Sequence, residues 1–152
     1  MNPEHLKFGL LILLLGVFSL TSCNNDDSPN DTTKDEIISN ASNGTWRITK
    51  FIDSDEDETN HFTGYNFTFN SSGVLSASNG TNSYEGTWSI TDSNSDDDSL
   101  DDLDFNINFS LTNDFEDLND DWDILTQTSS KIELIDISGG NGVTDYLTFE
   151  KN

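Results

Sequence analysis

Apolar and polar residues alternate with a period of two through most of the chain after residue 44. Such alternation is typical of β-strands that have one buried and one exposed face. Eight segments show it in succession, and we expect them as strands over residues 45–53, 61–70, 73–78, 83–91, 102–111, 121–127, 131–137 and 143–150. The pattern therefore predicts an all-β domain.

Turn-forming residues separate these segments. They stand at 70–73, at 139–142 and at Asn79-Gly80, which is the pair favoured in two-residue type I′ hairpins. Sequential strands with hairpin-length links close most simply as an eight-stranded antiparallel up-and-down barrel, because closure leaves no unpaired sheet edge. A β-sandwich is the alternative.

A short helix is expected before the first strand. Thr33 and Glu36 have the spacing of a capping box, in which each satisfies an amide at the start of a helix. Ile37, Ile38 and Ala41 would then share one helical face. We expect this helix to dock on the domain and to cap one end of the barrel.

The first residues have the organisation of an export signal. Residues 8–18 are an unbroken apolar run, which is shorter than the roughly 20 residues of a membrane-spanning helix. Leu20-Thr21-Ser22-Cys23 follows and resembles the lipobox of bacterial lipoproteins. The resemblance implies that Cys23 carries the lipid anchor. We therefore divide the chain into a signal peptide (1–22), a lipidated Cys23 with acidic tether and short helix (23–43), and a barrel domain (44–152).

Residues 24–27, Asn-Asn-Asp-Asp, resemble the signal that sends lipoproteins of Bacteroidetes bacteria to the outer face of the outer membrane. The implied location is the outer membrane, lipid-anchored and exposed on the cell surface, with its periplasmic face as the alternative. Two or three acyl chains make such anchoring essentially permanent. The partner is thus the membrane, which the chain binds through its lipid anchor, and the sequence does not identify a protein partner.

Charge and residue usage exclude several function classes. The chain has 29 acidic and 6 basic residues and a formal net charge of −23, which argues against nucleic-acid binding. Cys23 is the only cysteine, and His61 is the only histidine outside the signal, so zinc and Ser-His-Asp sites lack their residues. We expect a monomer that is not an enzyme and has no cofactor or metal.

Two acidic runs, residues 53–58 and 92–102, are candidates for calcium sites. Calcium needs roughly six to eight oxygen ligands on a defined turn. The second run matches the start of a calcium loop, but Asp97 stands in place of its glycine and Leu103 in place of its final glutamate. We interpret both runs as solvated charge.

The barrel region is similar to the lipocalin-like domains of Bacteroidetes lipoproteins. The similarity covers residues 44–152 and rests on Gly44-Thr45-Trp46, a G-x-W that opens the first strand, on Trp88, on the segment 118–124 and on the closing segment 146–151. It implies a barrel that binds a small, mostly apolar molecule. The alternative is a non-catalytic structural or interaction protein of the cell envelope with a filled barrel.

The two ends of the barrel are expected to differ. Trp46, Trp88 and Phe149 should gather in a closed-end core near the helix. By similarity to the basic residue that covers this tryptophan in lipocalins, Lys151 is expected to stack on Trp46 as a cation–π contact. At the opposite end, Ile52, Phe109 and Trp122 should line a ligand cavity. Phe62 joins them if Gly64 makes a bulge.

A second helical segment is expected across that open end. Asn113 and Glu116 have capping-box spacing, and Phe115 and Leu118 lie three residues apart, which predicts one or two helical turns within 112–119. Both apolar side chains would face inward and complete the candidate cavity. This segment would act either as a movable lid or as a permanent plug.

Overall fold

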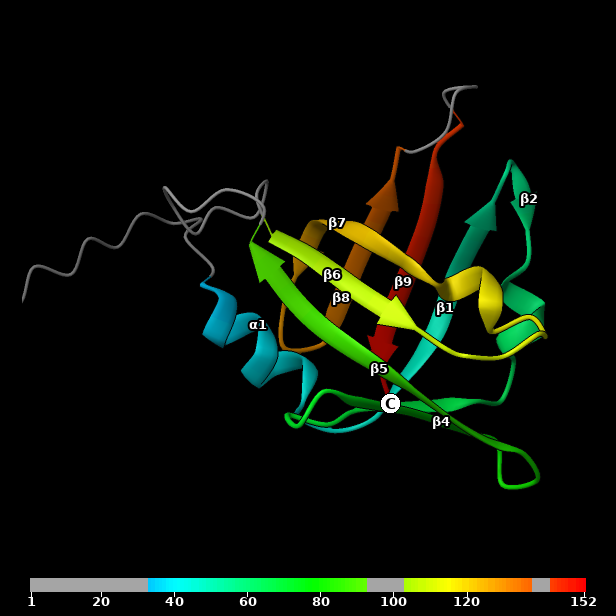
Figure 1. Ribbon diagram of the computed structural model, residues 1–152, viewed down its shortest axis with the longest axis horizontal. Helices are drawn as coiled ribbons and strands as arrows, with labels where there is room; N and C mark the ends of the chain where they lie inside the picture. The colour runs from blue at the N-terminus through cyan, green and yellow to red at the C-terminus, as the bar shows by residue number, and fades with distance from the viewer. Residues whose placement is uncertain (1–32, 93–102, 138–142) are drawn as a thin grey trace, which may run out of the picture.

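The computed structural model describes residues 33–92, 103–137 and 143–152 of the chain. They form one α-helix, two short 3-10 helices and nine strands (Figure 1). The elements in chain order are α1 (Lys34–Ala41), β1 (Trp46–Asp53), β2 (Glu56–Asp57), η1 (Thr59–Phe62), β3 (Asn66–Phe69), β4 (Val74–Ser78), β5 (Ser83–Asp92), β6 (Leu103–Asn108), η3 (Glu116–Leu118), β7 (Asp120–Gln127), β8 (Lys131–Asp136) and β9 (Asp145–Lys151). The signal segment, Cys23 and the acidic run 93–102 lie outside the described residues.

Eight of the strands close into an antiparallel barrel. The strands from β3 to β9 pair in sequence order, and β9 returns to β1, where Trp46 pairs with Lys151 and Ile52 with Tyr146. Figure 1 shows β1, β8 and β9 side by side. The short β2 pairs with the far end of β1, where Asp53 lies opposite Glu56. The predicted eight-stranded barrel is confirmed, and the sandwich alternative is wrong.

The barrel has two ends, the closed end and the mouth. The closed end comprises α1, the 70–73 turn, the β7–β8 turn and the last residues of β9. The mouth comprises residues 53–65, 79–82 and 109–119 together with the adjoining ends of β7 and β9. Because the strands alternate in direction, every second connection lies at the same end, as the sequence order predicts.

One seam of the barrel is only partly paired. β1 pairs with β3 at Trp46 and Phe67, close to the closed end. The predicted strand over 61–70 is wrong in its first half, because η1 occupies Thr59–Phe62 and Gly64 takes a left-handed φ of 84° that interrupts an extended chain. Residues 56–65 therefore cover the mouth side of the seam in place of a strand.

A β-bulge in β1 changes which of its residues face the interior. The register against β9 shifts between Ile48 and Lys50, so Thr49 is the extra residue. A bulge inserts one residue and moves every later side chain to the opposite face. Phe51 is consequently fully buried, whereas Ile52 is half-buried on the outer side. The prediction that Ile52 lines the interior is wrong.

The turn at Asn79 also differs from its prediction. β4 ends at Ser78 and β5 begins at Ser83, so the connection is a four-residue loop rather than a two-residue hairpin. Asn79 does not have the positive φ that type I′ requires. Its Oδ1 instead accepts the amides of Thr81 at 3.1 Å and Asn82 at 2.8 Å, and these side-chain bonds define the loop.

The helix α1 forms and docks as its sequence indicates. Thr33 Oγ1 accepts the Glu36 amide at 3.4 Å, which is the N-cap half of the expected capping box. Ile37 and Ala41 are fully buried against the barrel. Gly44 lies just past the helix with a φ of 94°, and a Cβ there would lie 2.8 Å from Cε of Lys151. The tight entry into β1 therefore needs glycine.

Candidate functional site at the mouth of the barrel

A cluster of aromatic rings, which we call the plug, fills the mouth. Its centre is Phe115, whose side chain is 2% exposed. The Phe115 ring centroid lies 4.7 Å from that of Tyr84, 5.1 Å from those of Tyr65 and Phe109, and 5.3 Å from that of Phe62. Most of these pairs meet edge to face, which is a favourable arrangement of ring quadrupoles. The plug places aromatic carbon where a ligand was expected to enter.

Side-chain hydrogen bonds fix the segment that carries Phe115. Asn119 donates from Nδ2 to the Phe109 carbonyl at 2.9 Å, and its Oδ1 accepts the Phe109 amide. Asn113 Oδ1 accepts the Phe115 amide at 3.3 Å. The expected helix is present as the single 3-10 turn η3. These bonds support the plug interpretation over the movable lid, because they tie the segment to Phe109, directly after β6, and fix its own first turn.

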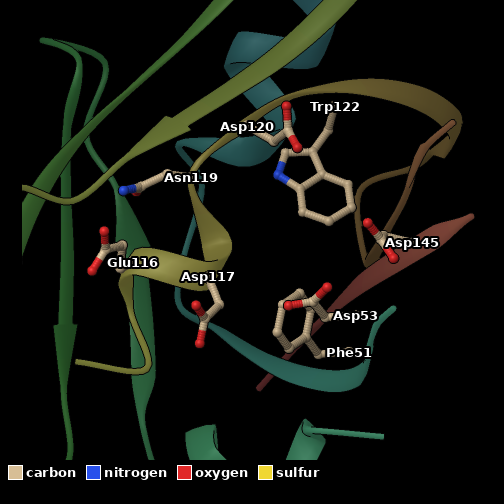
Figure 2. A pocket seen from close by; sticks show the side chains of 8 residues that line it. All are labelled: Phe51, Asp53, Glu116, Asp117, Asn119, Asp120, Trp122 and Asp145. Carbon is tan, nitrogen blue, oxygen red and sulfur yellow. The ribbon is translucent and has the colours of Figure 1, made fainter. Parts of the chain in front are cut away.

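A pocket of about 190 Å³ lies beside the plug (Figure 2). Two rings, Phe51 and Trp122, belong to its wall, with centroids 6.4 Å apart. The indole of Trp122 is oriented by a hydrogen bond from Nε1 to the Leu118 carbonyl at 3.1 Å. The other lining residues are polar and come from β1, η3, β7 and β9: Asp53, Glu116, Asp117, Asn119, Asp120 and Asp145.

The carboxylates of this pocket repel one another. Burial first, and then the nearby Asp136 and Asp121, raise the pKa of Asp120 to about 6 against a hydrogen bond from the Asp121 amide that lowers it. Burial also raises the pKa of Asp117, and the charges of Asp53, Asp114 and Glu116 act in the same direction. Positive charge brought into the pocket would therefore be stabilised by several carboxylates at once.

The chemistry of the pocket is that of a binding surface for cations. Carboxylate oxygens accept hydrogen bonds from ammonium groups, and the faces of Trp122 and Phe51 attract positive charge or apolar carbon. Across the described ranges 33–92, 103–137 and 143–152, no group of three or more His, Cys, Asp or Glu side chains is arranged to hold a metal ion.

Five of the six residues predicted to line a cavity are buried at the mouth. They are Phe62, Phe109, Phe115, Leu118 and Trp122. Phe62 reaches the interior from η1 rather than through a bulge at Gly64. The acidic side of the pocket was not predicted, because Asp53 and Asp145 meet the segment 116–120 only in the folded barrel. Phe51 was missed as well, and the bulge at Thr49 is the reason.

The closed-end residues lie where the sequence placed them. The Trp46 Nε1 donates to the Ala41 carbonyl at 2.8 Å, and Nζ of Lys151 lies 5.3 Å from the centroid of the Trp46 ring. Trp88 Nε1 donates to the Asn70 carbonyl at 2.8 Å. Phe149 and Trp88 do not pair directly but both meet Phe69, at 5.2 Å each. Phe69 is thus the centre of this core and was not singled out from the sequence.

Comparison with solved structures shows a distant likeness. No protein-family model matches the chain, and no curated protein matches it. A crystal structure of a DUF4847 family protein from Bacteroides vulgatus is similar at 20% identity and a TM-score of 0.46, over 74% of this chain and 94% of that one. A likeness this remote supports no statement about function. In the described residues, no helix is long and apolar enough to span a membrane.

Proposed function

We propose that this chain is a lipid-anchored lipoprotein of the outer membrane whose lipocalin-like barrel is a filled, non-catalytic scaffold of the cell envelope. The observation that carries the scaffold role is a chain of ring contacts from the mouth to the closed end. Phe115 meets Phe67 at 6.0 Å, Phe67 meets Phe149 at 5.4 Å, and Phe149 meets Phe69 at 5.2 Å. Phe69 in turn contacts Trp88 at 5.2 Å.

The size of the mouth pocket supports the same interpretation. Sites for drug-sized molecules enclose roughly 300–1,000 Å³ and are lined mainly by apolar groups. The pocket at the mouth has about 190 Å³ and is lined mainly by carboxylates. A small apolar ligand, the leading expectation from the lipocalin resemblance, would face charged oxygens there and lose more than it gained.

The anchor rests on Leu20-Thr21-Ser22-Cys23, which places the single cysteine directly after the apolar run. We expect Cys23→Ser to abolish labelling by a clickable fatty acid and to release the protein from membranes. The barrel should fold unchanged, as judged by its circular dichroism. Continued labelling of the Cys23→Ser protein would contradict the lipoprotein assignment.

Truncation of the plug tests the filled barrel. Phe115→Ala should lower the free energy of unfolding by about 3 kcal/mol, as core truncations of phenylalanine do. Titration with fatty acids should leave the fluorescence of Trp122 unchanged in both proteins. Leu111→Ala, at a partly buried position just before η3, is the matched control and should cost about 1 kcal/mol or less. Saturable quenching by a fatty acid, together with a stable Phe115→Ala protein, would favour a ligand-holding barrel.

The mouth pocket favours a second candidate, the binding of a small organic cation with a short apolar part. Its carboxylates would pair with the charge, and Phe51 and Trp122 would contact the apolar part. Alkylammonium ions should then quench Trp122 saturably, while alcohols of equal chain length should not. Asp120→Asn should weaken this binding, and Asp123→Asn, at an exposed position on β7, should not. Equal responses to the ammonium and alcohol series would exclude this candidate.

A further inference from the structure

The mouth side of the seam between β1 and β3 is covered by residues 56–64, which we call the flap. The flap comprises β2, η1 and the residues that lead to Gly64. On the rest of the barrel wall, adjacent strands are joined by ladders of backbone pairs, such as β4 with β5 from Val74–Thr87 to Ser78–Ser83. β1 and β3 pair at Trp46 and Phe67 alone among the described residues. The flap is therefore the least paired part of the described wall.

Unusual backbone conformations mark both ends of the flap. Ser54 and Asp55, immediately before it, have φ values of 51° and 68°. Gly64, at its end, has a φ of 84°, and a side chain there would meet no atom within 4 Å. Left-handed residues in tight turns can absorb a large change of backbone direction, which is what a hinge needs. Ser54–Asp55 and Gly64 are therefore the two positions on which the covering segment would pivot.

Side-chain and backbone hydrogen bonds and one buried ring hold the flap against β1. Thr59 Oγ1 accepts the Phe51 amide at 2.8 Å and donates to the Phe51 carbonyl at 3.4 Å, so one side chain takes the place of a neighbouring strand. The Glu58 amide donates to the same carbonyl at 3.0 Å. Phe62 enters the plug, with its ring 5.5 Å from Phe51 and 5.3 Å from Phe115.

We propose that the flap opens as a unit on Ser54–Asp55 and Gly64, separating from β1 and withdrawing Phe62 from the plug while the rest of the barrel stays folded. Opening breaks the two-residue β2 ladder, the Thr59 bonds and the ring contacts of Phe62. It uncovers Phe51, Phe67 and Phe115 along the open seam. Lipid anchoring and the scaffold role neither require this motion nor exclude it.

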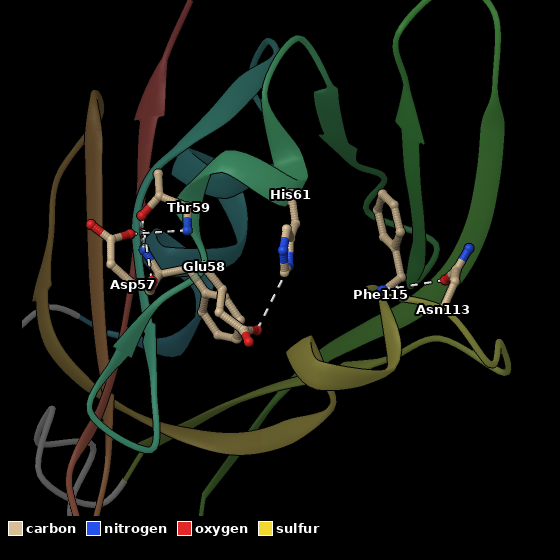
Figure 3. Close-up of polar contacts among 7 residues, drawn as sticks. Asp57, Glu58, Thr59, His61, Asn113 and Phe115 are labelled. Carbon is tan, nitrogen blue, oxygen red and sulfur yellow. Dashed lines mark hydrogen bonds and ion pairs between the residues drawn. The ribbon is translucent and has the colours of Figure 1, made fainter.

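The charges around Glu58 make the closed flap sensitive to pH. Glu58 faces His61 of η1, with 3.8 Å between Oε2 and Nδ1 (Figure 3). The charges of Glu56 in β2, Asp53 in β1 and Asp117 in η3 also act on the Glu58 carboxylate. Its Oε2 is a buried atom without a hydrogen-bond partner. In the closed flap, the Glu58 carboxylate therefore lies near three other carboxylates and the imidazole of His61.

The direction of the pH dependence follows from these contacts. Burial, and then the charges of Asp117, Asp53 and Glu56, raise the pKa of Glu58 above its ordinary 4.5 in spite of His61. The closed flap therefore binds a proton that the open flap has already lost, and closure weakens as the pH rises above about 4.5. The pKa of Asp57 is lowered by its hydrogen bonds to Thr59, so Asp57 adds no slope above its ordinary 3.8.

Hydrogen exchange of the full lipidated chain in detergent tests the opening. After correction for intrinsic rates, the amides of Phe51 and Glu58 should exchange faster than those of the β4–β5 ladder. Thr59→Val should accelerate their exchange about fivefold further. This is the change in the opening equilibrium expected from the loss of one hydrogen bond. Thr87→Val, at an exposed position of β5, is the control and should leave the flap rates unchanged.

Glu58→Gln tests the pH dependence of flap opening. In the unaltered chain, corrected flap exchange should increase severalfold from pH 4.5 to pH 7, and Glu58→Gln should remove most of that increase. Glu85→Gln, at an exposed position on β5, should retain it. The proposal is overturned if the flap amides exchange at the rate of global unfolding. It is equally overturned if Thr59→Val accelerates the β4–β5 amides as much as those of the flap.

Discussion

The closed end and the mouth of this barrel treat their polar groups in opposite ways. At the closed end, the Trp46 indole donates to the Ala41 carbonyl, and Lys151 lies over the same ring with its Nζ donating to the Ser129 carbonyl at 3.0 Å. At the mouth, Asp120 and Glu58 are brought toward other carboxylates, and burial raises the pKa of each.

This difference predicts that the two ends of the barrel differ in local stability. The paired Trp46 and Trp88 indoles and the apolar contacts of the closed end should make it the part that resists local opening. Like charges and a partly paired seam weaken the mouth, where the pocket and the flap lie. Elements that move or bind are drawn from the less stable parts of a fold. The following changes break or sharpen this comparison, from the largest expected effect to the smallest.

Removal of the Trp46 side chain should have the largest effect. Trp46→Ala should lower the free energy of unfolding by about 3–5 kcal/mol, because it empties a fully buried site and leaves the Ala41 carbonyl without its donor. Trp46→Phe keeps most of the ring and should cost less. Urea denaturation followed by circular dichroism measures both. A melting temperature unchanged in Trp46→Ala would show that the closed end does not stabilise the barrel.

Two buried phenylalanines compare the ends directly. Phe69 at the closed end is 0% exposed and Phe62 in the flap is 1% exposed. Burial alone therefore predicts equal losses of stability when either ring is removed. Phe69→Ala should cost about 4 kcal/mol as a core truncation. Phe62→Ala should cost at least about 1 kcal/mol less, because the flap can open and admit water to the cavity. Equal losses in denaturant titrations would contradict a difference between the ends.

Neutralising Asp120 should stabilise the protein. Its folded pKa is raised to about 6 from the ordinary 3.8, so the folded state holds a proton that the unfolded state releases in that window. Stability therefore falls as the pH rises from about 4 to about 6. Asp120→Asn should flatten this part of the profile and add about 1 kcal/mol at pH 7 after allowance for solvent screening. Glu85→Gln should do neither.

Loss of the Lys151 ammonium should have the smallest effect. Lys151→Met keeps the aliphatic stem but removes the charge from the Trp46 face and the exposed hydrogen bond to the Ser129 carbonyl, and we expect a cost of about 0.5–1 kcal/mol. Lys151→Arg should retain most of the stability. The difference between the two variants should persist in high salt, since a contact with a ring face depends less on screening than a surface ion pair does. Equal stabilities would show that the cation–π contact contributes nothing.

The sequence by itself determined the elements that depend on neighbours along the chain. Alternating residues such as Phe67 and Phe69 specify a strand with one buried face, and Thr33 with the apolar face of α1 specifies a capped, docked helix. The two contrasting ends follow as well, because strands that alternate in direction place every second connection at the same end. These features need no contact between distant parts of the chain.

Only the tertiary structure decided the features that depend on distant partners. The bulge at Thr49 arises from the register between β1 and β9, about 100 residues apart, and it exchanges Phe51 for Ile52 in the interior. The acidic pocket joins Asp53, Asp120 and Asp145, which no local pattern connects. The flap replaces half of an expected strand because Phe62 gains more from the plug than from an extended chain. Packing across the barrel, not local preference, set each of these positions.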